Sequence, residues 1–395
     1  MIRRRSLLTA AGLGGAALAL PGTTPLATPA LATPAPGGAG APIDLPAPTA
    51  GRPVGTVSLH LVDGSRQDPF APAPGPRELM VQLWYPAAGT AGRPRAPYTT
   101  ARVASAMERD AFLDQGTLGR MRPTARLGAP ALPGALPLLL LGHGRKGGRS
   151  NCTALAEDLA AHGYLVASVD HTYDAAAVEF PDGRVVHSVL EDEPADWDAA
   201  ERKEIAARVA DLRFVTTELT TGRTALRHPA LPGADPRRIG VFGHSMGGAA
   251  AAEAVRQDRR FAAGLDMDGG FYGSPVADEG LDRPFLLLTA LADHETWQRW
   301  RSHQRGWGRQ LLQRDSGHLS FTDRPYSAGP GHFADHVPRE LYAALFGTIS
   351  PARSSALARA YVRAHFDRFL RGRPSPLLNA PSPRHPEISF VWSRG

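Results

Sequence analysis

Only one cysteine and two lysines occur in the 395 residues, and both shortages restrict what the protein can be. Because Cys152 is the only cysteine, no disulfide framework within the chain can stabilise the fold. Lys146 and Lys203 are the only lysines among 44 basic residues, and no basic run is interleaved with aromatic residues. A nucleic-acid partner therefore has little support, although the formal net charge is +6.

Motifs for metal ions and cofactors are also missing from the sequence. No His or Cys pairs fall at metal-ligand spacing, and no glycine-rich loop of the phosphate-binding type is present. We therefore expect neither a metal ion nor a cofactor. The apolar fraction of 43% and the charged fraction of 21% are those of a soluble globular protein, so a folded domain is expected.

The first 32 residues have the features of an export signal. Three arginines at 3–5 precede an apolar run over 7–20, and Ala30-Leu31-Ala32 offers a small-residue cleavage site. The run is too short and too rich in Gly and Ala to span a bilayer as a stop-transfer helix, and the alternative to a cleaved signal is a retained N-terminal anchor. We therefore expect a secreted protein with a signal peptide over 1–32, of the twin-arginine or, alternatively, the general secretory type. Residues 33–52 mix Pro, Ala, Gly and Thr, which predicts a disordered spacer.

The rest of the chain, 53–395, alternates between apolar strands and amphipathic helices and is predicted to form a single domain. Residues 54–62 and 78–85 have the pattern of a hairpin at the edge of a sheet. The strands expected after it are 137–141, 164–169, 238–242, 262–267, 284–289 and 310–314, and the expected helices are 103–113, 150–162, 201–226, 246–256 and 352–370. Apolar strands separated by helices indicate right-handed crossovers and a mainly parallel, mixed sheet with helices on both faces.

A G-x-S-x-G motif, Gly243-His244-Ser245-Met246-Gly247, lies between an expected strand and an Ala-rich expected helix. In this context the motif is typical of a nucleophile at a sharp turn that lifts the serine above the sheet. Positions 243 and 247 require glycine because a Cβ atom there would collide with the turn. The helix N-terminus directs its N–H groups toward the reacting oxygen. We predict Ser245 as the nucleophile of an α/β-hydrolase fold; the alternative is a Gly-rich junction with an idle serine.

Two backbone N–H groups are candidates for an oxyanion hole. One belongs to Met246, the residue after the predicted nucleophile. The other belongs to Arg145, in the Gly-rich loop after the expected strand 137–141. Such donors stabilise the charge that builds on an ester carbonyl oxygen, and losing one costs about 3 kcal/mol. The alternative is that His143 and the glycines of this loop only end a strand.

A base and an acid would complete the site, and in this fold they follow the nucleophile in the order acid, then His. His318 is the predicted base because it lies in a loop just past the last expected parallel strand. Asp268 and Asp293 each follow an expected strand, and the pattern alone leaves both open as the acid. Asp266 shares the strand of Asp268, but its side chain is expected to point to the opposite side. The weaker candidates for the base are His332 and His336 in a later loop.

Several stretches within 54–372 resemble the platelet-activating factor acetylhydrolase family, the α/β-hydrolase type found in plasma and in bacteria. The matching stretches are 77–86, 142–144, 159–164, 243–248, 260–268 and 317–318. The resemblance implies Asp268 as the acid, with Asp293 in reserve, and Arg145 and Met246 as the oxyanion donors. It also implies removal of short acyl groups, typically acetyl, from phospholipids without calcium.

Two features differ from that family pattern. Arg145 stands where a small or apolar residue is common, and its side chain is expected to narrow or charge the mouth of the pocket. The segment Trp297 to Trp307 is rich in Trp and Arg. Its tryptophans either grip a lipid or polyester or are ordinary cover for the edge of the sheet.

Together these residues predict a secreted serine carboxylic-ester hydrolase, acetylhydrolase-like, that acts on small-molecule or lipid esters. Short acyl esters are the expected substrates, including the sn-2 acetyl group of phospholipids. Transient contact with lipid surfaces fits this function, and no obligate protein partner is implied. One alternative is a broader secreted lipase or polyester hydrolase. The others are a secreted peptidase and a catalytically silent binding protein on the same fold.

Overall fold

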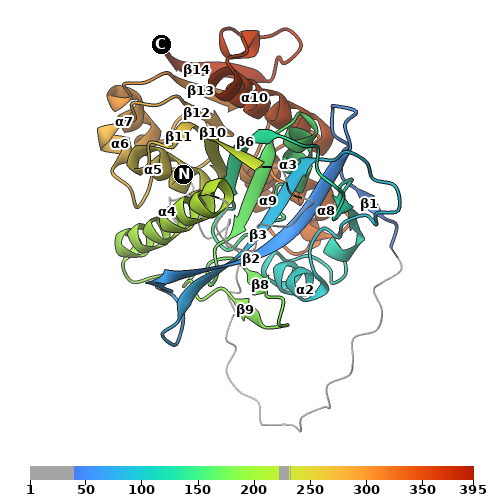
Figure 1. Cartoon of the computed structure of the whole chain (residues 1–395). Coiled ribbons are helices and arrows are strands. Elements are labelled where there is room, and N and C mark those ends of the chain that lie inside the picture. Colours follow the sequence, from blue (N-terminus) through green and yellow to red (C-terminus); the bar gives the residue numbers. More distant parts are fainter. Residues whose placement is uncertain (1–39, 222–230, 232) are drawn as a thin grey trace.

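A ten-stranded mixed sheet forms the centre of the fold (Figure 1). The computed structural model describes residues 40–221, 231 and 233–395. The strands lie in the order β14-β13-β12-β11-β10-β6-β7-β3-β2-β5. Their bounds are β2 Val54–Gln67, β3 Pro76–Pro86, β5 Arg126–Leu127, β6 Ala135–Gly142, β7 Leu165–Asp170, β10 Gly233–His244, β11 Phe261–Met267, β12 Phe285–Thr289, β13 Gly308–Gln313 and β14 Ile388–Arg394. All pairings from β7 to β13 are parallel, which confirms the predicted α/β-hydrolase architecture.

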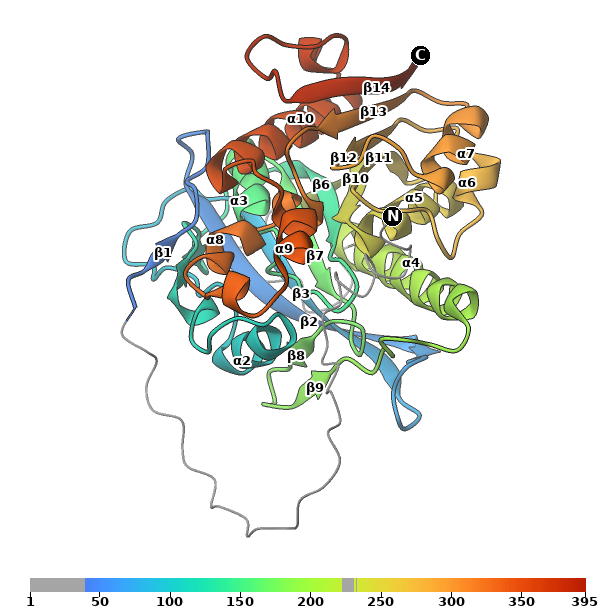
Figure 2. The same ribbon diagram turned by 180° about the vertical axis from the view of Figure 1, so that it is seen from behind.

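Helices cover both faces of the sheet (Figures 1 and 2). One apolar cluster joins the sheet to α4, α5, α6 and α7, and a second joins it to α3 and α10. A third cluster joins α2, α8 and α9. The helix bounds are α2 Ala101–Asp110, α3 Thr153–Ala161, α4 Trp197–Thr221, α5 Met246–Gln257, α6 Val276–Glu279, α7 Glu295–His303, α8 Arg324–Ala328, α9 Arg339–Phe346 and α10 Pro351–Arg371, with 3-10 helices η1 Leu118–Arg120, η2 His318–Phe321, η3 Phe333–Asp335 and η4 Pro376–Leu378. The five predicted helices are present with shifted ends, and 222–226 of the predicted 201–226 helix lie outside the described residues.

Strand β14 is not predicted from the sequence. It pairs antiparallel with β13, so the expected strand 310–314 is the last parallel strand but not the edge of the sheet. Trp392 of β14 packs edge-on against Trp300 of α7, with ring centroids 5.1 Å apart. The strand follows a Pro-rich segment, and its pairing partner lies far away in the sequence. Local pattern therefore gave little indication of it.

Residues 40–52 are ordered on the domain, which corrects the predicted disordered spacer over 33–52. The short strands β1 Ile43–Asp44 and β4 Met121–Arg122 pair in parallel, and Leu45 is buried. Arg359 of α10 donates hydrogen bonds of 2.8 Å to the carbonyls of Pro46 and Ala47. The buried side chains of Ile43 and Leu45 and these hydrogen bonds hold the segment on the domain, although its composition is that of a loop. The predicted signal peptide over 1–32 lies outside the described residues.

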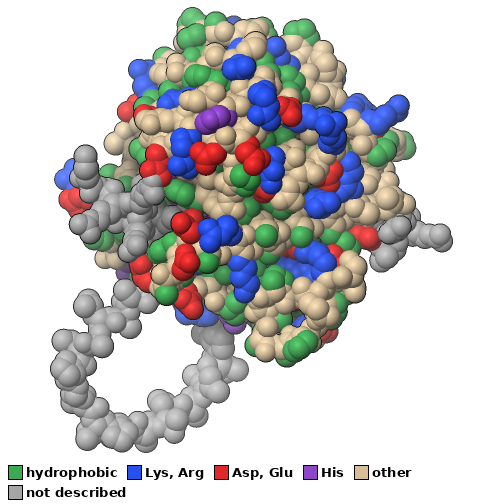
Figure 3. Space-filling model, turned by 90° about the vertical axis from the view of Figure 1, so that its left-hand side faces the viewer, with side chains coloured by type: hydrophobic (Ala, Val, Ile, Leu, Met, Phe, Trp, Pro, Cys, Tyr) green, Lys and Arg blue, Asp and Glu red, His purple; other side chains and the backbone are tan. Residues whose placement is uncertain are grey.

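Charges of both signs are interspersed on the face of the molecule seen in Figure 3. Exposed ion pairs of this kind include Arg256 with Glu279 (3.1 Å) and Arg299 with Asp278 (3.0 Å). Each such pair contributes little to stability, about 0–1 kcal/mol. None of the helices in the described ranges has the length and apolar character needed to cross a membrane.

Candidate active site

Ser245 lies at a sharp turn between β10 and α5, at the carboxyl end of the parallel strands. Its backbone has φ 55° and ψ −126°, a conformation that costs a non-glycine residue about 1–3 kcal/mol. Its N–H donates a hydrogen bond to the carbonyl of Met267 on β11 (2.9 Å), which helps to hold the turn. The strained turn sets Ser245 in front of the N-terminus of α5, as the motif predicts.

Two glycines allow this turn to pack against its neighbours. A Cβ atom on Gly243 would come 2.3 Å from the backbone of Gly247. A Cβ atom on Gly247 would come 2.2 Å from the carbonyl oxygen of Gly142, at the end of β6. The G-x-S-x-G glycines are therefore required by backbone contact, as the motif predicts.

We predict that Gly247→Ala lowers the free energy of unfolding by about 1–3 kcal/mol, measured by urea denaturation. Gly247 lies in helix α5, where alanine would otherwise stabilise by about 0.5–1 kcal/mol, so the sign of the change reports the clash. Gly329→Ala is the matched control, because Gly329 has helical φ and ψ (−66°, −58°) and no atom within 4 Å of an added Cβ. A Gly247→Ala protein as stable as wild type contradicts the packing described.

His318 and Asp268 share the central hydrogen bond of the site. Nδ1 of His318, at the start of η2, is 2.7 Å from Oδ2 of Asp268. Asp268 follows β11 with φ 62°, and its Oδ1 accepts a hydrogen bond of 2.7 Å from the N–H of Ala290. Within the described part of the chain, Nε2 of His318 has no hydrogen-bond partner. The carboxylate thus holds the tautomer with hydrogen on Nδ1 and leaves Nε2 as a free acceptor.

The carboxylates of Asp293 and Asp266 are not hydrogen-bonded to His318. Asp293 is exposed, and its Oδ1 accepts hydrogen bonds from the N–H of His294 (3.0 Å) and from Arg301 (2.9 Å). Asp266 is buried beside α5 and accepts from the N–H of Gly269 (2.9 Å). The sequence pattern left Asp268 and Asp293 open, and of these two only Asp268 contacts His318 in the structure. His332 and His336, the weaker candidates for the base, contact the exposed Asp114.

His244, the residue before Ser245 in the motif, contacts both the ring and the backbone of His318. Its ring lies 4.6 Å from the His318 ring, and its Nε2 donates a hydrogen bond of 2.7 Å to the His318 carbonyl. Burial and, to a smaller extent, the neighbouring His318 ring lower the pKa of His244 to about 3, so the ring is neutral at ordinary pH. A neutral His244 thus fixes the backbone of His318.

The loop after β6, which holds the predicted oxyanion donor Arg145, lies next to Ser245. A Cβ atom on Gly144 would lie 3.3 Å from the Cβ of Ser245. In the described ranges, the backbone N–H groups of Arg145 and Met246 donate no hydrogen bond. The prediction that the Arg145 side chain charges the mouth of the pocket is wrong. Its guanidinium is buried and binds the carboxylate of Glu204 on α4 at 3.0 Å.

A cavity of about 550 Å³ opens beside Ser245, Asp268 and His318. Its other walls are mostly apolar and include Leu291, Trp297, Ala343 and Ala344, with the paired Tyr272 and His294 at one side. Trp297 is the one member of the Trp-rich segment that borders this cavity, and its Nε1 donates to the carbonyl of Gly269 (2.7 Å). Trp300 is buried in the first apolar cluster and the half-buried Trp307 packs against the second, so both are cover for the sheet.

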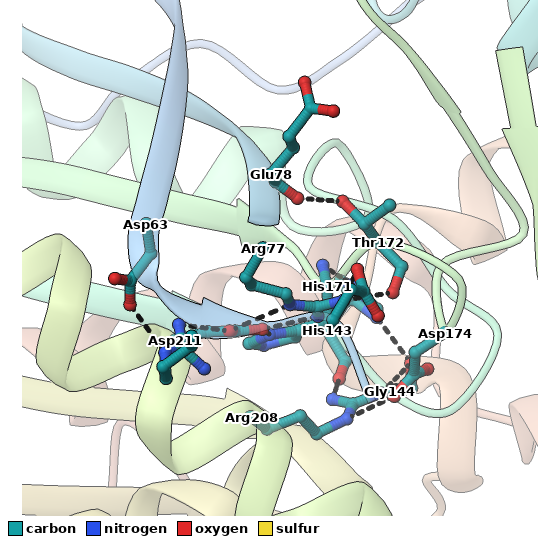
Figure 4. Close-up of polar contacts among 12 residues, drawn as sticks. Asp63, Arg77, Glu78, His143, Gly144, His171, Thr172, Asp174, Arg208 and Asp211 are labelled. Atoms are coloured by element: carbon teal, nitrogen blue, oxygen red, sulfur yellow. Dashed lines mark hydrogen bonds and ion pairs between the residues drawn. The ribbon is translucent and has the colours of Figure 1, made fainter. Parts of the chain in front are cut away.

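Three buried polar residues of α4 are not predicted from the sequence, and two of them, Glu204 and Arg208, hold the loop after β6. Glu204, Arg208 and Asp211 are buried on the same helix as the core residues Ile205, Val209 and Leu212. Charged side chains on the apolar side of a predicted helix indicate a buried polar network, because a buried charge requires hydrogen-bonded or oppositely charged partners. Figure 4 shows Arg208 directed at Gly144 and Asp174.

Chemically, the site combines a strained serine, an imidazole held by a carboxylate and two N–H groups at one end of the sheet. This set can carry out nucleophilic acyl transfer. Within the described ranges, no group of three or more His, Cys, Asp or Glu side chains is placed to hold a metal ion.

Comparisons with known proteins agree with this fold. The family model "Platelet-activating factor acetylhydrolase, isoform II" matches residues 99–217. A probable 1-alkyl-2-acetylglycerophosphocholine esterase of Arthroderma benhamiae is 27% identical over 88% of this chain and 93% of its own. The platelet-activating factor acetylhydrolase of Bos taurus is 28% identical over 37% of each chain. The solved structure of a ferulic acid esterase from Streptomyces cinnamoneus aligns with a TM-score of 0.79 and 43% identity, over 89% of this chain and 99% of that one.

Proposed function

The chain belongs to the platelet-activating factor acetylhydrolase family of α/β-hydrolases and is an ester hydrolase, and from this premise we propose that it is a secreted serine esterase that cleaves short acyl esters. The proposed substrates include the sn-2 acetyl group of phospholipids. One observation carries the proposal: His318 is hydrogen-bonded to Asp268, its Nε2 has no partner among the described residues, and both side chains line one cavity with Ser245. Secretion rests on the signal-like sequence of residues 1–32.

The first half of the proposed reaction forms an acyl-enzyme. Nε2 of His318 takes the proton of Ser245 as Oγ attacks the ester carbonyl carbon. The tetrahedral oxyanion accepts hydrogen bonds from the N–H groups of Met246 and Arg145. His318 then gives the proton to the leaving alcohol as the carbon–oxygen bond breaks. The bond from Ser245 to His318 is absent in the free protein described here, and such bonds commonly tighten only when substrate binds.

The second half regenerates the enzyme with water. His318 takes a proton from the water, whose oxygen attacks the acyl carbon, and returns it to Oγ of Ser245 as the acid leaves. Asp268 stays ionised throughout, orients the imidazole and stabilises the imidazolium that forms twice in each cycle. No cofactor is needed for this sequence.

A second candidate function is the cleavage of esters of aromatic acids. The cavity volume lies within the range of 300–1,000 Å³ that drug-sized ligands occupy, so it exceeds what an acetyl group needs. Tyr272, His294 and Trp297 place three rings along its wall. The similarity to the ferulic acid esterase of Streptomyces cinnamoneus supports the same candidate.

Hydrolysis of a matched ester series tests the proposal. The series runs from p-nitrophenyl acetate through octanoate to palmitate, with methyl ferulate added, and Ser245→Ala serves as the blank. We expect kcat/KM for acetate to exceed that for octanoate by at least about tenfold. The same assay on medium and cells of an expressing culture tests secretion.

Other outcomes assign other functions. Preference for palmitate replaces the proposal with a lipase or polyester hydrolase, and fastest turnover of methyl ferulate favours the aromatic-acid esterase. Cleavage of amide substrates in place of esters identifies a peptidase. A protein that cleaves none of these compounds is the silent binding protein.

A further inference from the structure

Helix α4 places a buried arginine, Arg208, against the loop that follows β6 (Figure 4). Its guanidinium donates hydrogen bonds to the carbonyl oxygen of His143 and, at 3.3 Å, to that of Gly144. The carboxylate of Asp174 accepts from the same guanidinium at 2.6 and 2.7 Å. Burial raises the pKa of Asp174, but the charge of Arg208 lowers it to about 2, so Asp174 is an anion. Arg208 therefore joins a fixed anion to the main chain of this loop.

The carbonyl oxygen of Gly144 accepts three hydrogen bonds. Besides Arg208, its donors are the N–H of Gly147 (3.0 Å) and Nδ1 of His143 (2.6 Å). Burial and the charge of Arg208 lower the pKa of His143 to about 3, so this imidazole is neutral. Its Nε2 accepts from the N–H of His171 (3.3 Å), which leaves the hydrogen on Nδ1 for Gly144.

The Gly144 carbonyl and the Arg145 N–H belong to the same peptide unit. A trans peptide is planar, so its N–H points away from its C=O. The three donors on the oxygen thus determine where the Arg145 N–H points. That N–H is unpaired within the described ranges, and its peptide unit starts at Gly144, where an added Cβ atom would lie 3.3 Å from the Cβ of Ser245.

The same helix also holds the other side of this peptide unit. Glu204, one turn before Arg208, binds the side chain of Arg145 through both carboxylate oxygens, at 3.0 Å for Nε to Oε2 and for Nη2 to Oε1. Both residues are buried, so water competes little with these bonds. Two neighbouring turns of α4 therefore fix the orientation of one peptide.

Building on the function proposed above, we propose that Arg208, held by Asp174, is a positioning residue of the oxyanion hole. It touches neither Ser245 nor the substrate. It fixes the peptide unit so that the Arg145 N–H is already aimed at the oxyanion before the reaction starts. Without Arg208 this peptide can turn, and part of the donor's effect on the transition state is lost. Removing one oxyanion donor outright lowers kcat by about 10²–10³-fold.

The test compares Arg208→Met, made together with Asp174→Asn to avoid an unpaired buried charge, with Arg359→Met. Arg359 is the matched control because it is also buried and donates to three carbonyls, of Pro46, Ala47 and Ala154, on the other face of the sheet. We expect the Arg208 variant to lose about 10–100-fold in kcat on p-nitrophenyl acetate, with KM within about twofold. Inhibition by a trifluoromethyl ketone, which forms the tetrahedral adduct, is expected to weaken by the same factor. Circular dichroism and urea denaturation report the folded fraction.

A wild-type kcat in the folded double variant overturns the inference. A loss of kcat in Arg359→Met as large as that in the double variant also overturns it. If the double variant does not fold, Arg208→Lys decides, because an ammonium group cannot bind Asp174 and both carbonyls in the geometry of the guanidinium. Arg208→Lys is expected to lose kcat with KM unchanged, and a kcat equal to wild type overturns the inference in the same way. Ser245→Ala separates the two proposals. An active Ser245→Ala protein refutes the proposed function itself, whereas an inactive one with a fully active Arg208 variant refutes only the positioning role.

Discussion

Asp268→Asn is expected to lower kcat by about four orders of magnitude while leaving the protein folded. The asparagine amide can still accept the hydrogen bond that the Ala290 N–H makes to Oδ1 of Asp268. Toward His318, however, an NH2 group replaces the acceptor oxygen 2.7 Å from Nδ1. The imidazole must then carry its hydrogen on Nε2, the wrong tautomer for taking a proton from Ser245. The substitution also removes the charge that stabilises the imidazolium.

Asp293→Asn is the matched control for this prediction. Asp293 also follows a strand of the sheet, but it is exposed and bonded to Arg301 and the His294 N–H. Its loss is expected to change kcat by less than about twofold, as for a surface polar contact. Steady-state kinetics with p-nitrophenyl acetate measure both variants. A large loss in Asp293→Asn with an active Asp268→Asn enzyme would reassign the acid.

The architecture was predictable because it depends on patterns that are local in the sequence. Continuous apolar segments such as 138–141 and 285–288 are buried on both faces, which only a covered parallel sheet provides. The motif around Ser245 was predictable for a steric reason, since Gly243 and Gly247 have no room for a Cβ atom. Sequence therefore indicated the sheet, the turn and the serine on it.

The choice of acid depended on a feature that spacing does not encode. Asp268 and Asp293 both follow strands of the sheet. What separates them is the positive φ of Asp268 and the Ala290 N–H that binds its carboxylate, which together turn the side chain toward His318. Both are tertiary features, so the residue pattern alone could not decide whether Asp268 or Asp293 is the acid.

The buried polar residues Glu204 and Arg208, which hold the loop after β6, could not be predicted from local sequence because their contacts are also tertiary. The contacts of Arg208 are with residues 34 and 64–65 positions away, on loops that only the folded sheet brings together. Residues 40–52 resemble a linker in composition, yet Arg359 holds them from more than 300 positions away. In each case the buried partner is distant in sequence.

Ser245→Ala is expected to lower kcat by about 10⁶-fold, the largest effect in this protein. The variant lacks the oxygen that forms the acyl-enzyme, and His318 and Asp268 cannot replace it, because they act through that oxygen. Residual hydrolysis would come from the oxyanion donors acting on a water molecule. Alanine also keeps the backbone of the turn, so the loss is expected without a change of fold.

Steady-state hydrolysis of p-nitrophenyl acetate by purified Ser245→Ala tests most directly whether Ser245 is the nucleophile of an esterase. Circular dichroism establishes that wild type and variant are equally folded. We expect turnover near the detection limit in the variant and readily measured turnover in wild type. Equal rates in the two proteins would contradict the claim and show that the ester is cleaved by another group.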